Sequence, residues 1–221
     1  MNIADDLLLV LLDNAAARPA LDDHRRQRLL AAAVLLDLAY ACRIRPAEAG
    51  DDAPQGTLVP LMGTDPTTPA AARALSLVAR KPVRAETAIA KLRGKVETEL
   101  FEELERQGRI HSVLLYTKGF RRQEAWTLTD RTRPARVRAA VLAVLTDNFA
   151  PDPLIAALIS LLHSMNSLGA LLSFDALGWE LVNDRAAEIA SGSWVNESAT
   201  DLPEINLAVT MAAIRPALSR Y

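Results

Sequence analysis

The sequence lacks several features that stabilise small proteins by special chemistry. Cys42 is the only cysteine among 221 residues, so no internal disulfide can form. We expect Cys42 to act as a small buried hydrophobe in a reducing compartment. Aromatic residues make up 5% of the chain while alanine and leucine are abundant, which favours helix over sheet.

Long apolar runs are also missing. A spanning helix needs about 20 consecutive apolar residues, whereas Leu7–Leu12 has six and the run at 154–162 is interrupted by Ser160. No basic segment precedes an apolar run at the N-terminus, so we expect no signal peptide. These absences predict a cytoplasmic protein without a transmembrane span, with the inner face of the membrane as a peripheral location.

Motifs for catalysis are equally scarce. The chain has no GxxxxGK[ST] phosphate loop, no GxGxxG, no HExxH and no CxxC pair. His24, His111 and His163 lie in different segments without ligand spacing. Glu102 and Glu103 are adjacent on one predicted helix, so they do not converge as a catalytic pair would. We therefore expect no enzyme activity, no cofactor and no metal.

Charge is plentiful but uneven along the chain. The formal net charge is -2, yet residues 80–138 carry 15 Lys/Arg and 8 Asp/Glu, a balance of +7. A basic middle with acidic flanks can steer an anionic partner to one face. The alternative is a solvated surface whose charges pair locally. Arginine outnumbers lysine 21 to 4, which is typical of a GC-rich bacterial genome.

Apolar residues at three- and four-residue spacing predict a mainly α chain. The predicted helices span residues 7–12, 23–42, 70–80, 86–91, 95–107, 135–149, 153–165, 184–190 and 204–218. Arg43–Arg45 and Leu58–Leu61 are expected to pair as short strands. Neither an internal repeat nor a low-complexity segment interrupts this pattern, so we expect a single domain over residues 1–221.

Residues 95–130 predict a different element, a helix followed by a β-hairpin. An acidic amphipathic helix stops at Gly108, and two strands flank a basic turn around residues 118–120. An apolar turn residue beside cations suits lipid headgroups or another subunit, although hairpin apolar residues also serve as ordinary core. The candidate membrane or oligomer contacts are Leu114, Tyr116, Lys118, Phe120, Arg121, Arg122 and Trp126.

Three sequence segments, in this order and spacing, resemble the Golgi phosphoprotein 3 family. They are IADDLLLVLLD at residues 3–13, LDLA at 36–39 followed by Arg43-Ile44, and LERQGRI at 104–110. The resemblance covers nearly the whole chain. It implies a mostly helical single domain with a projecting β-hairpin used in self-association.

The resemblance also implies a ligand. Eukaryotic members are peripheral membrane proteins that bind phosphatidylinositol 4-phosphate and tether glycosyltransferases. Their lipid pocket uses a tryptophan and an arginine near the second helix, and two basic residues in the helix before the hairpin. At these four positions the present chain has Asp22, Ala31, Gly94 and Glu97. The resemblance therefore implies the fold without the phosphoinositide-binding residues.

Neighbouring cations could still form a looser site for an anionic lipid headgroup or a phosphorylated ligand. The candidate anion-binding residues are Arg25, Arg26, Arg28, Arg93 and Lys95. Several cations near an anionic bilayer gain about 1 kcal/mol per charge, enough for reversible association. For the three arginines of the second helix, the alternative is a solvated turn paired to nearby acids.

Two other functions remain open from sequence. A helix, a strand, a basic turn and a second strand mimic a winged helix that binds nucleic acid, with Arg121 and Arg122 on phosphates. Five glutamates on the supposed recognition helix oppose this, because they would repel phosphate. The other alternative is a pure oligomerisation scaffold in which the hairpin side chains are buried between subunits.

Overall fold

The structure is a computed structural model that describes residues 2–14, 19–117, 121–196 and 201–219, with the backbone alone at 115–117, 121–124 and 196. The described residues form eight α-helices, a β-hairpin and a small three-stranded sheet, which confirms the predicted mainly α class with a hairpin. The helices are α1 (Ile3–Leu12), α2 (Asp23–Tyr40), α3 (Pro69–Arg80), α4 (Ala85–Arg106), α5 (Thr132–Thr146), α6 (Pro153–Ser164), α7 (Ala176–Ala190) and α8 (Leu202–Leu218). The strands are β1 (Ile44–Pro46), β2 (Thr57–Pro60), β3 (Val83–Arg84), β4 (Ile110–Thr117) and β5 (Arg121–Leu128).

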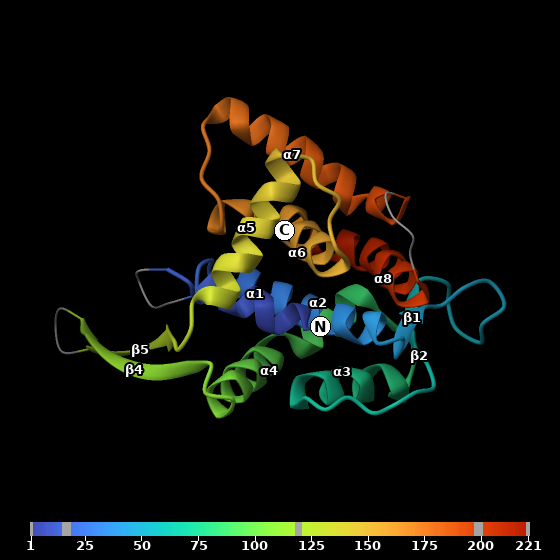
Figure 1. Ribbon diagram of the computed structural model, residues 1–221. Coiled ribbons are helices and arrows are strands. Elements are labelled where there is room, and N and C mark those ends of the chain that lie inside the picture. Colours follow the sequence, from blue (N-terminus) through green and yellow to red (C-terminus); the bar gives the residue numbers. More distant parts are fainter. Residues whose placement is uncertain (1, 15–18, 118–120, 197–200, 220–221) are drawn as a thin grey trace.

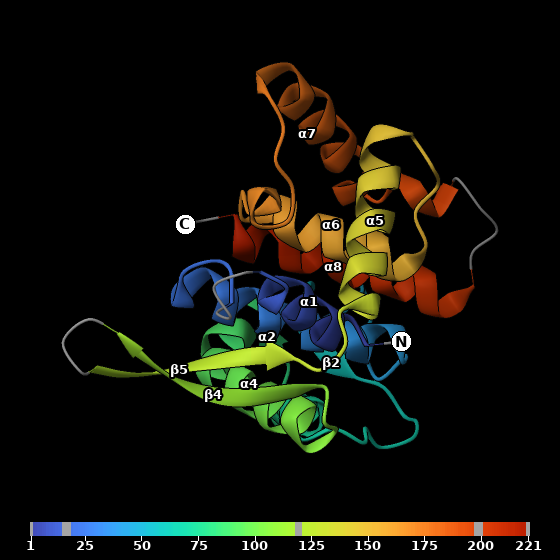
Figure 2. The ribbon, with the colours of Figure 1, turned by 60° about the vertical axis from the view of Figure 1, so that its left-hand side comes forward.

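The helices form layers around α1 and α2 (Figure 1). On one side lie α3, α4 and the β4–β5 hairpin, and on the other lie α5 to α8, an order that the rotated view repeats (Figure 2). Helix α2 contacts α3 and α4 on one side and α6 and α8 on the other. The two central helices therefore carry the core on both sides.

Helix α1 is central because it is apolar all round from Leu7 to Leu12. Every residue from Ile3 to Leu12 is buried, including Asp5 and Asp6, which pair with Arg109 and Arg133. Replacing one of its leucines, such as Leu8, by alanine would lower the free energy of unfolding by about 2–5 kcal/mol. Its N-terminus is capped by Asn2, whose side chain accepts from the N–H of Asp5.

A small sheet joins the second and third helices. Strands β1 and β2 pair antiparallel with Ile44 opposite Pro60, which is the pairing that the sequence suggested. The third strand, β3, was not predicted: it pairs with the start of β2, Thr57 lying opposite Arg84. Only two residues long, β3 is too short to show a strand pattern in sequence.

Helix α4 differs from the sequence prediction of two helices at 86–91 and from 95. It is one helix, Ala85–Arg106, that passes through the exposed Gly94 without a break. Leu92 and Val96 are buried on either side of this glycine, so packing against neighbouring helices outweighs the roughly 1 kcal/mol helix penalty of glycine. The predicted stop is confirmed at Gly108, whose φ is +67°.

The β4–β5 hairpin is anchored at one end and projects at the other (Figures 1 and 2). At its base, Ile110 pairs with Leu128 and is buried. Trp126 packs on Phe101 of α4, with ring centroids 4.6 Å apart. Further out, Leu114 is 60% exposed. The hairpin therefore holds to the body through α4 and extends away from it.

The last helices follow the sequence prediction with shifted bounds. Helix α7 begins at Ala176 rather than near residue 184, because Asp175 caps it by accepting from the N–H of Gly178. Trp194 is buried in a short 3-10 turn that follows α7. Trp179 packs edge-on against Phe174, with the ring centroids 5.5 Å apart. Both tryptophans thus support packing among the last helices.

Candidate functional site

Two hollows lie beside α4, one on each side. Residues four apart on a helix share a face, so Lys91 and Lys95 face one side while Glu97 and Phe101 face another. The first pair lies toward α3 and the second toward α2 and the base of the hairpin. We call these spaces the α3–α4 groove and the α2–α4 hollow.

The α3–α4 groove has a volume of about 470 Å³. Its lining residues are Pro69, Arg73, Ser76, Leu77, Arg80, Lys91, Leu92, Lys95 and Glu99. Glu99 is the one carboxylate among them, and it accepts from Nε of Arg73 at 2.7 Å. This hydrogen bond raises the pKa of the Arg73 guanidinium above its ordinary value. The remaining cations of the groove are Arg80, Lys91 and Lys95.

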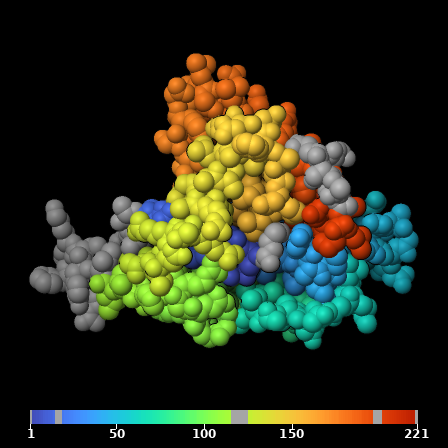
Figure 3. Space-filling view, viewed as in Figure 1, coloured from blue at the N-terminus to red at the C-terminus, as the bar shows by residue number. Residues whose placement is uncertain are grey.

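Unpaired cations are concentrated around this groove. Most arginines of the described residues bond to a carboxylate, as Arg45 does to Asp51 at 2.6 Å and Arg133 does to Asp6 at 2.5 Å. Within the described chain, six exposed cations between residues 80 and 95 have no such partner. This basic segment consists of Arg80, Lys81, Arg84, Lys91, Arg93 and Lys95. Its residues belong to the end of α3, the first half of α4 and the turn between them; α3 lies along the lower edge of the molecule in Figure 3.

The α2–α4 hollow has the opposite charge. Its volume is about 690 Å³, and it is lined by Pro19, Leu21, Asp23, Arg26, Glu97, Thr98, Phe101, Glu102, Glu105 and Trp126. Nε of Arg26 donates to Glu97 at 2.5 Å, and Gln27 donates to the other oxygen of Glu97 at 2.8 Å. Four carboxylates and one guanidinium thus line a space with an aromatic floor of Phe101 and Trp126.

The three predicted arginines of the second helix are engaged by the protein. Arg25 is exposed and lies 3.5 Å from Asp22. Arg26 joins α2 to α4 through Glu97, with Asp23 at 2.9 Å from its other nitrogen. Arg28 is only 3% exposed and donates to the backbone carbonyl of Ala217. This corrects the expectation that Arg28 lies in a surface patch, because burial removes it from a surface ligand.

The other two predicted cations remain accessible. Arg93 and Lys95 are both exposed on α4, and neither has a carboxylate partner in the part of the chain that the structure describes. Lys95 lines the α3–α4 groove, whereas Arg93 lies outside it. The structure therefore does not gather the five candidate anion-binding residues into one place.

The predicted hairpin contacts are described only in part. Leu114 is exposed, and Trp126 is half-buried against Phe101. The side chains of Tyr116, Arg121 and Arg122, together with the residues Lys118 and Phe120, lie outside the described part. Trp126 thus packs at the base of the hairpin. Among the described side chains of the predicted set, Leu114 is the one exposed for a contact with another molecule.

The positions at which the resemblance implies a lipid pocket have other tasks here. Asp22 caps α2 by accepting from the N–H of Arg25, and Ala31 is fully buried. Gly94 lies exposed on α4, while Glu97 binds Arg26. None of the four can attract an anion, and the adjoining hollow is acidic.

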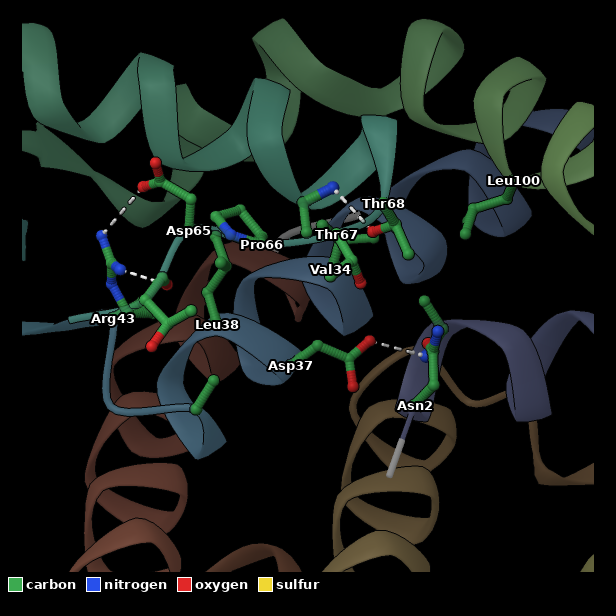
Figure 4. Close-up of a pocket in the computed structure, with 14 residues that line it drawn as sticks. Asn2, Val34, Asp37, Leu38, Arg43, Asp65, Pro66, Thr67, Thr68 and Leu100 are labelled. Carbon is green, nitrogen blue, oxygen red and sulfur yellow. Dashed lines mark hydrogen bonds and ion pairs between the residues drawn. The ribbon is translucent and has the colours of Figure 1, made fainter.

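A third pocket, shown in Figure 4, holds ionisable groups that serve the scaffold. Asp37 accepts from the backbone N–H of Ile3 at 2.6 Å and of Ala4 at 3.1 Å, which fixes the start of α1 on α2. Burial raises the pKa of this carboxyl to about 7, against the lowering effect of the two N–H groups. Arg43 donates to the carbonyl of Thr64 and lies 3.8 Å from Asp65. Both charged side chains are therefore committed to the fold.

Sequence reasoning missed two of the groove residues, Arg80 and Lys91. A usable signal was present: three of the four lysines in this arginine-rich chain, Lys81, Lys91 and Lys95, fall within fifteen residues. Lysine is a compact, strongly hydrated point charge on a flexible stem, and less suited than arginine to fixed ion pairs. A cluster of lysines in such a chain therefore indicates an exposed basic surface.

Comparison with known proteins identifies one family. The profile of the family described as Golgi phosphoprotein 3 (GPP34) matches residues 3–204, from the start of α1 into α8. A comparison with curated proteins found no match. Across the described residues, none of the helices combines the length and apolarity needed to cross a bilayer.

Proposed function

Since the chain belongs to the Golgi phosphoprotein 3 family, we propose that it is a non-enzymatic protein that docks reversibly on anionic membrane surfaces. The basic segment makes this contact, and the hairpin supports self-association. Family membership supports a binding role rather than a catalytic one. The site differs from the one that the resemblance implies, since it uses the α3 side of α4.

One observation carries the proposal: six exposed cations between residues 80 and 95 have no carboxylate partner among the described residues. Each cation near an anionic leaflet contributes about 1 kcal/mol, so three or four engaged at once give a dissociation constant in the millimolar range. Such binding is reversible and weakens with salt, because the Debye length is only about 8 Å at physiological ionic strength.

Vesicle flotation tests the membrane role. We expect recovery of the protein with vesicles of phosphatidylcholine and phosphatidylglycerol, little recovery with pure phosphatidylcholine, and loss of binding at high salt. A variant with all six cations of the basic segment changed to glutamine should stay in solution. A control with Arg25→Gln and Arg136→Gln, at exposed arginines elsewhere, should float as the unmodified protein does. Equal recovery with neutral and anionic vesicles would refute the proposal.

Self-association has a separate test. The exposed Leu114 and the projecting shape of the hairpin support a contact between copies of the chain. We expect Leu114→Asp to lower the mass measured by light scattering at high protein concentration. Leu142→Asp on α5, where leucine is also exposed, is the control and should leave the mass unchanged. An unchanged mass in both variants would remove the hairpin from this role.

A further inference from the structure

We propose that the α3–α4 groove binds a phosphate monoester group between Arg80, Lys91 and Lys95. This inference rests on the proposed function, because it names the ligand chemistry of the same basic surface. It concerns a defined space and three side chains rather than the charge of the whole segment. Its location differs from that of the α2–α4 hollow, which Glu97 lines.

The helix geometry brings the three cations around one space. Helices α3 and α4 run antiparallel, since the short connection at Val83–Arg84 reverses the chain between them. The Arg73–Glu99 bond fixes their register at one end of the groove. Arg80, in the last turn of α3, and Lys91 then line the other end. Lys95 lies one turn along α4 from Lys91, on the same face.

The charge of this space suits a dianion. Like charges at close spacing on a helix repel each other mildly, and no carboxylate within the described residues offsets Arg80, Lys91 or Lys95. Glu99 is bound to Arg73 through one of its two oxygens, so its charge is offset by that guanidinium. A phosphate monoester carries about -1.5 to -2 at neutral pH, whereas a diester carries a single charge. Three cations therefore balance a monoester better than a diester.

The lining can also contact the molecule that carries the phosphate group. The volume of about 470 Å³ exceeds what one phosphate group fills, so space remains for the molecule that carries it. Leu77 and Leu92 supply apolar surface, and the hydroxyl of Ser76 supplies a neutral donor. This combination fits a phosphorylated glycerol or polyol, either free in solution or as a lipid headgroup.

Vesicles of matched charge test the ligand chemistry. One set contains phosphatidic acid, a monoester, and the other contains twice that mole fraction of phosphatidylglycerol, a diester, both in phosphatidylcholine. We expect the full chain to bind the monoester vesicles at about fivefold lower lipid concentration, as one additional charge contact would give. Equal binding to the two sets would overturn the inference.

Two triple variants separate the groove from the rest of the basic segment. Arg80→Gln with Lys91→Gln and Lys95→Gln should remove the preference for the monoester. Lys81→Gln with Arg84→Gln and Arg93→Gln removes the same charge outside the groove and should weaken binding to both vesicles while keeping the preference. Circular dichroism confirms that both are folded. Loss of the preference in both variants alike would also overturn the inference.

A soluble probe distinguishes the source of the phosphate. Heat of binding for glycerol 3-phosphate, measured by calorimetry and absent in the groove variant, supports the groove as a monoester site. If glycerol 3-phosphate gives this heat but the protein binds no vesicles, the ligand of the groove is a soluble phosphate monoester. The groove inference then stands, and the proposed membrane role fails. Vesicle binding without monoester preference and without such heat leaves the membrane role standing and overturns the groove inference.

Discussion

The α3–α4 groove and the α2–α4 hollow share one helix and differ in what their charges do. In the hollow, Arg26 and Glu97 bond to each other, and together they tie α2 to α4. In the groove, Arg80, Lys91 and Lys95 bond to no carboxylate of the described residues. The two sides of α4 therefore separate charges that hold the fold from charges that remain available.

The difference follows from burial. Arg26 and Glu97 have side chains only 11% and 12% exposed, so neither could lose its partner without leaving a poorly solvated charge. The groove cations are exposed, and water satisfies them at little cost to the fold. Net charge along the sequence does not reveal this difference, because it counts both kinds alike.

The largest expected effect concerns Asp37, a half-buried carboxyl that holds the start of α1 on α2. Burial raises its pKa to about 7 from an ordinary 3.8, so the folded protein keeps a proton that the unfolded chain releases. The contribution of Asp37 to stability is then largest below pH 4 and is lost as pH rises from 4 to 7, by up to about 4 kcal/mol. Urea unfolding across this range, compared with Asp37→Asn, measures it.

Asp37→Asn should flatten this part of the pH dependence, whatever its effect on stability at a single pH. Asp5 remains a source of slope in both proteins, since burial also raises its pKa, to about 6. A variant whose slope between pH 6 and 7 equals that of the unmodified protein would show that Asp37 does not titrate there.

The next prediction concerns the loss of the Arg26–Glu97 ion pair in the α2–α4 hollow. Glu97→Gln leaves Arg26 without its closest carboxylate, and we expect the free energy of unfolding to fall by about 3 kcal/mol. Lys95→Gln, two residues earlier on the exposed side, should change it by less than about 0.5 kcal/mol. Urea denaturation at neutral pH gives both values. Similar losses in the two variants would erase the proposed distinction between the sides of α4.

Much of the fold could be predicted from the sequence, because long-range packing and local pattern agree there. The apolar run of α1, the stop at Gly108 and the β1–β2 pairing were all visible. The predicted break before Lys95 was wrong because local propensity at Gly94 competes with burial of Leu92 and Val96. Tertiary contacts decide such cases, and the sequence pattern alone does not weigh them.

The site was less predictable, for a reason of the same kind. Arg25, Arg26 and Arg28 crowd one helical turn, and Arg28 turns inward to the carbonyl of Ala217, 189 residues away. No local pattern announces a partner at that distance. Lys95 was found, but Arg80 and Lys91 were not, because they approach it only when α3 folds back on α4.

A further prediction tests the contrast by raising the net positive charge of the groove. Glu99→Gln removes the groove carboxylate and releases Arg73, so the affinity for anionic vesicles should rise about fivefold. Glu102→Gln removes the same charge from the hollow and should change the affinity by less than about twofold. Flotation across a lipid titration gives both values. Equal gains would mean that net charge alone, rather than the groove, governs binding.

The smallest expected effect comes from replacing lysine by arginine, which keeps the positive charge and changes the geometry of the cationic group. Lys91→Arg together with Lys95→Arg should leave binding to phosphatidylglycerol vesicles within about twofold, because contact with a diffuse anionic surface depends mainly on the number of charges. At a monoester the planar, bidentate guanidinium differs from a point charge, so affinity for phosphatidic acid should shift more. A larger change with phosphatidylglycerol than with phosphatidic acid would contradict a groove that orders a single phosphate.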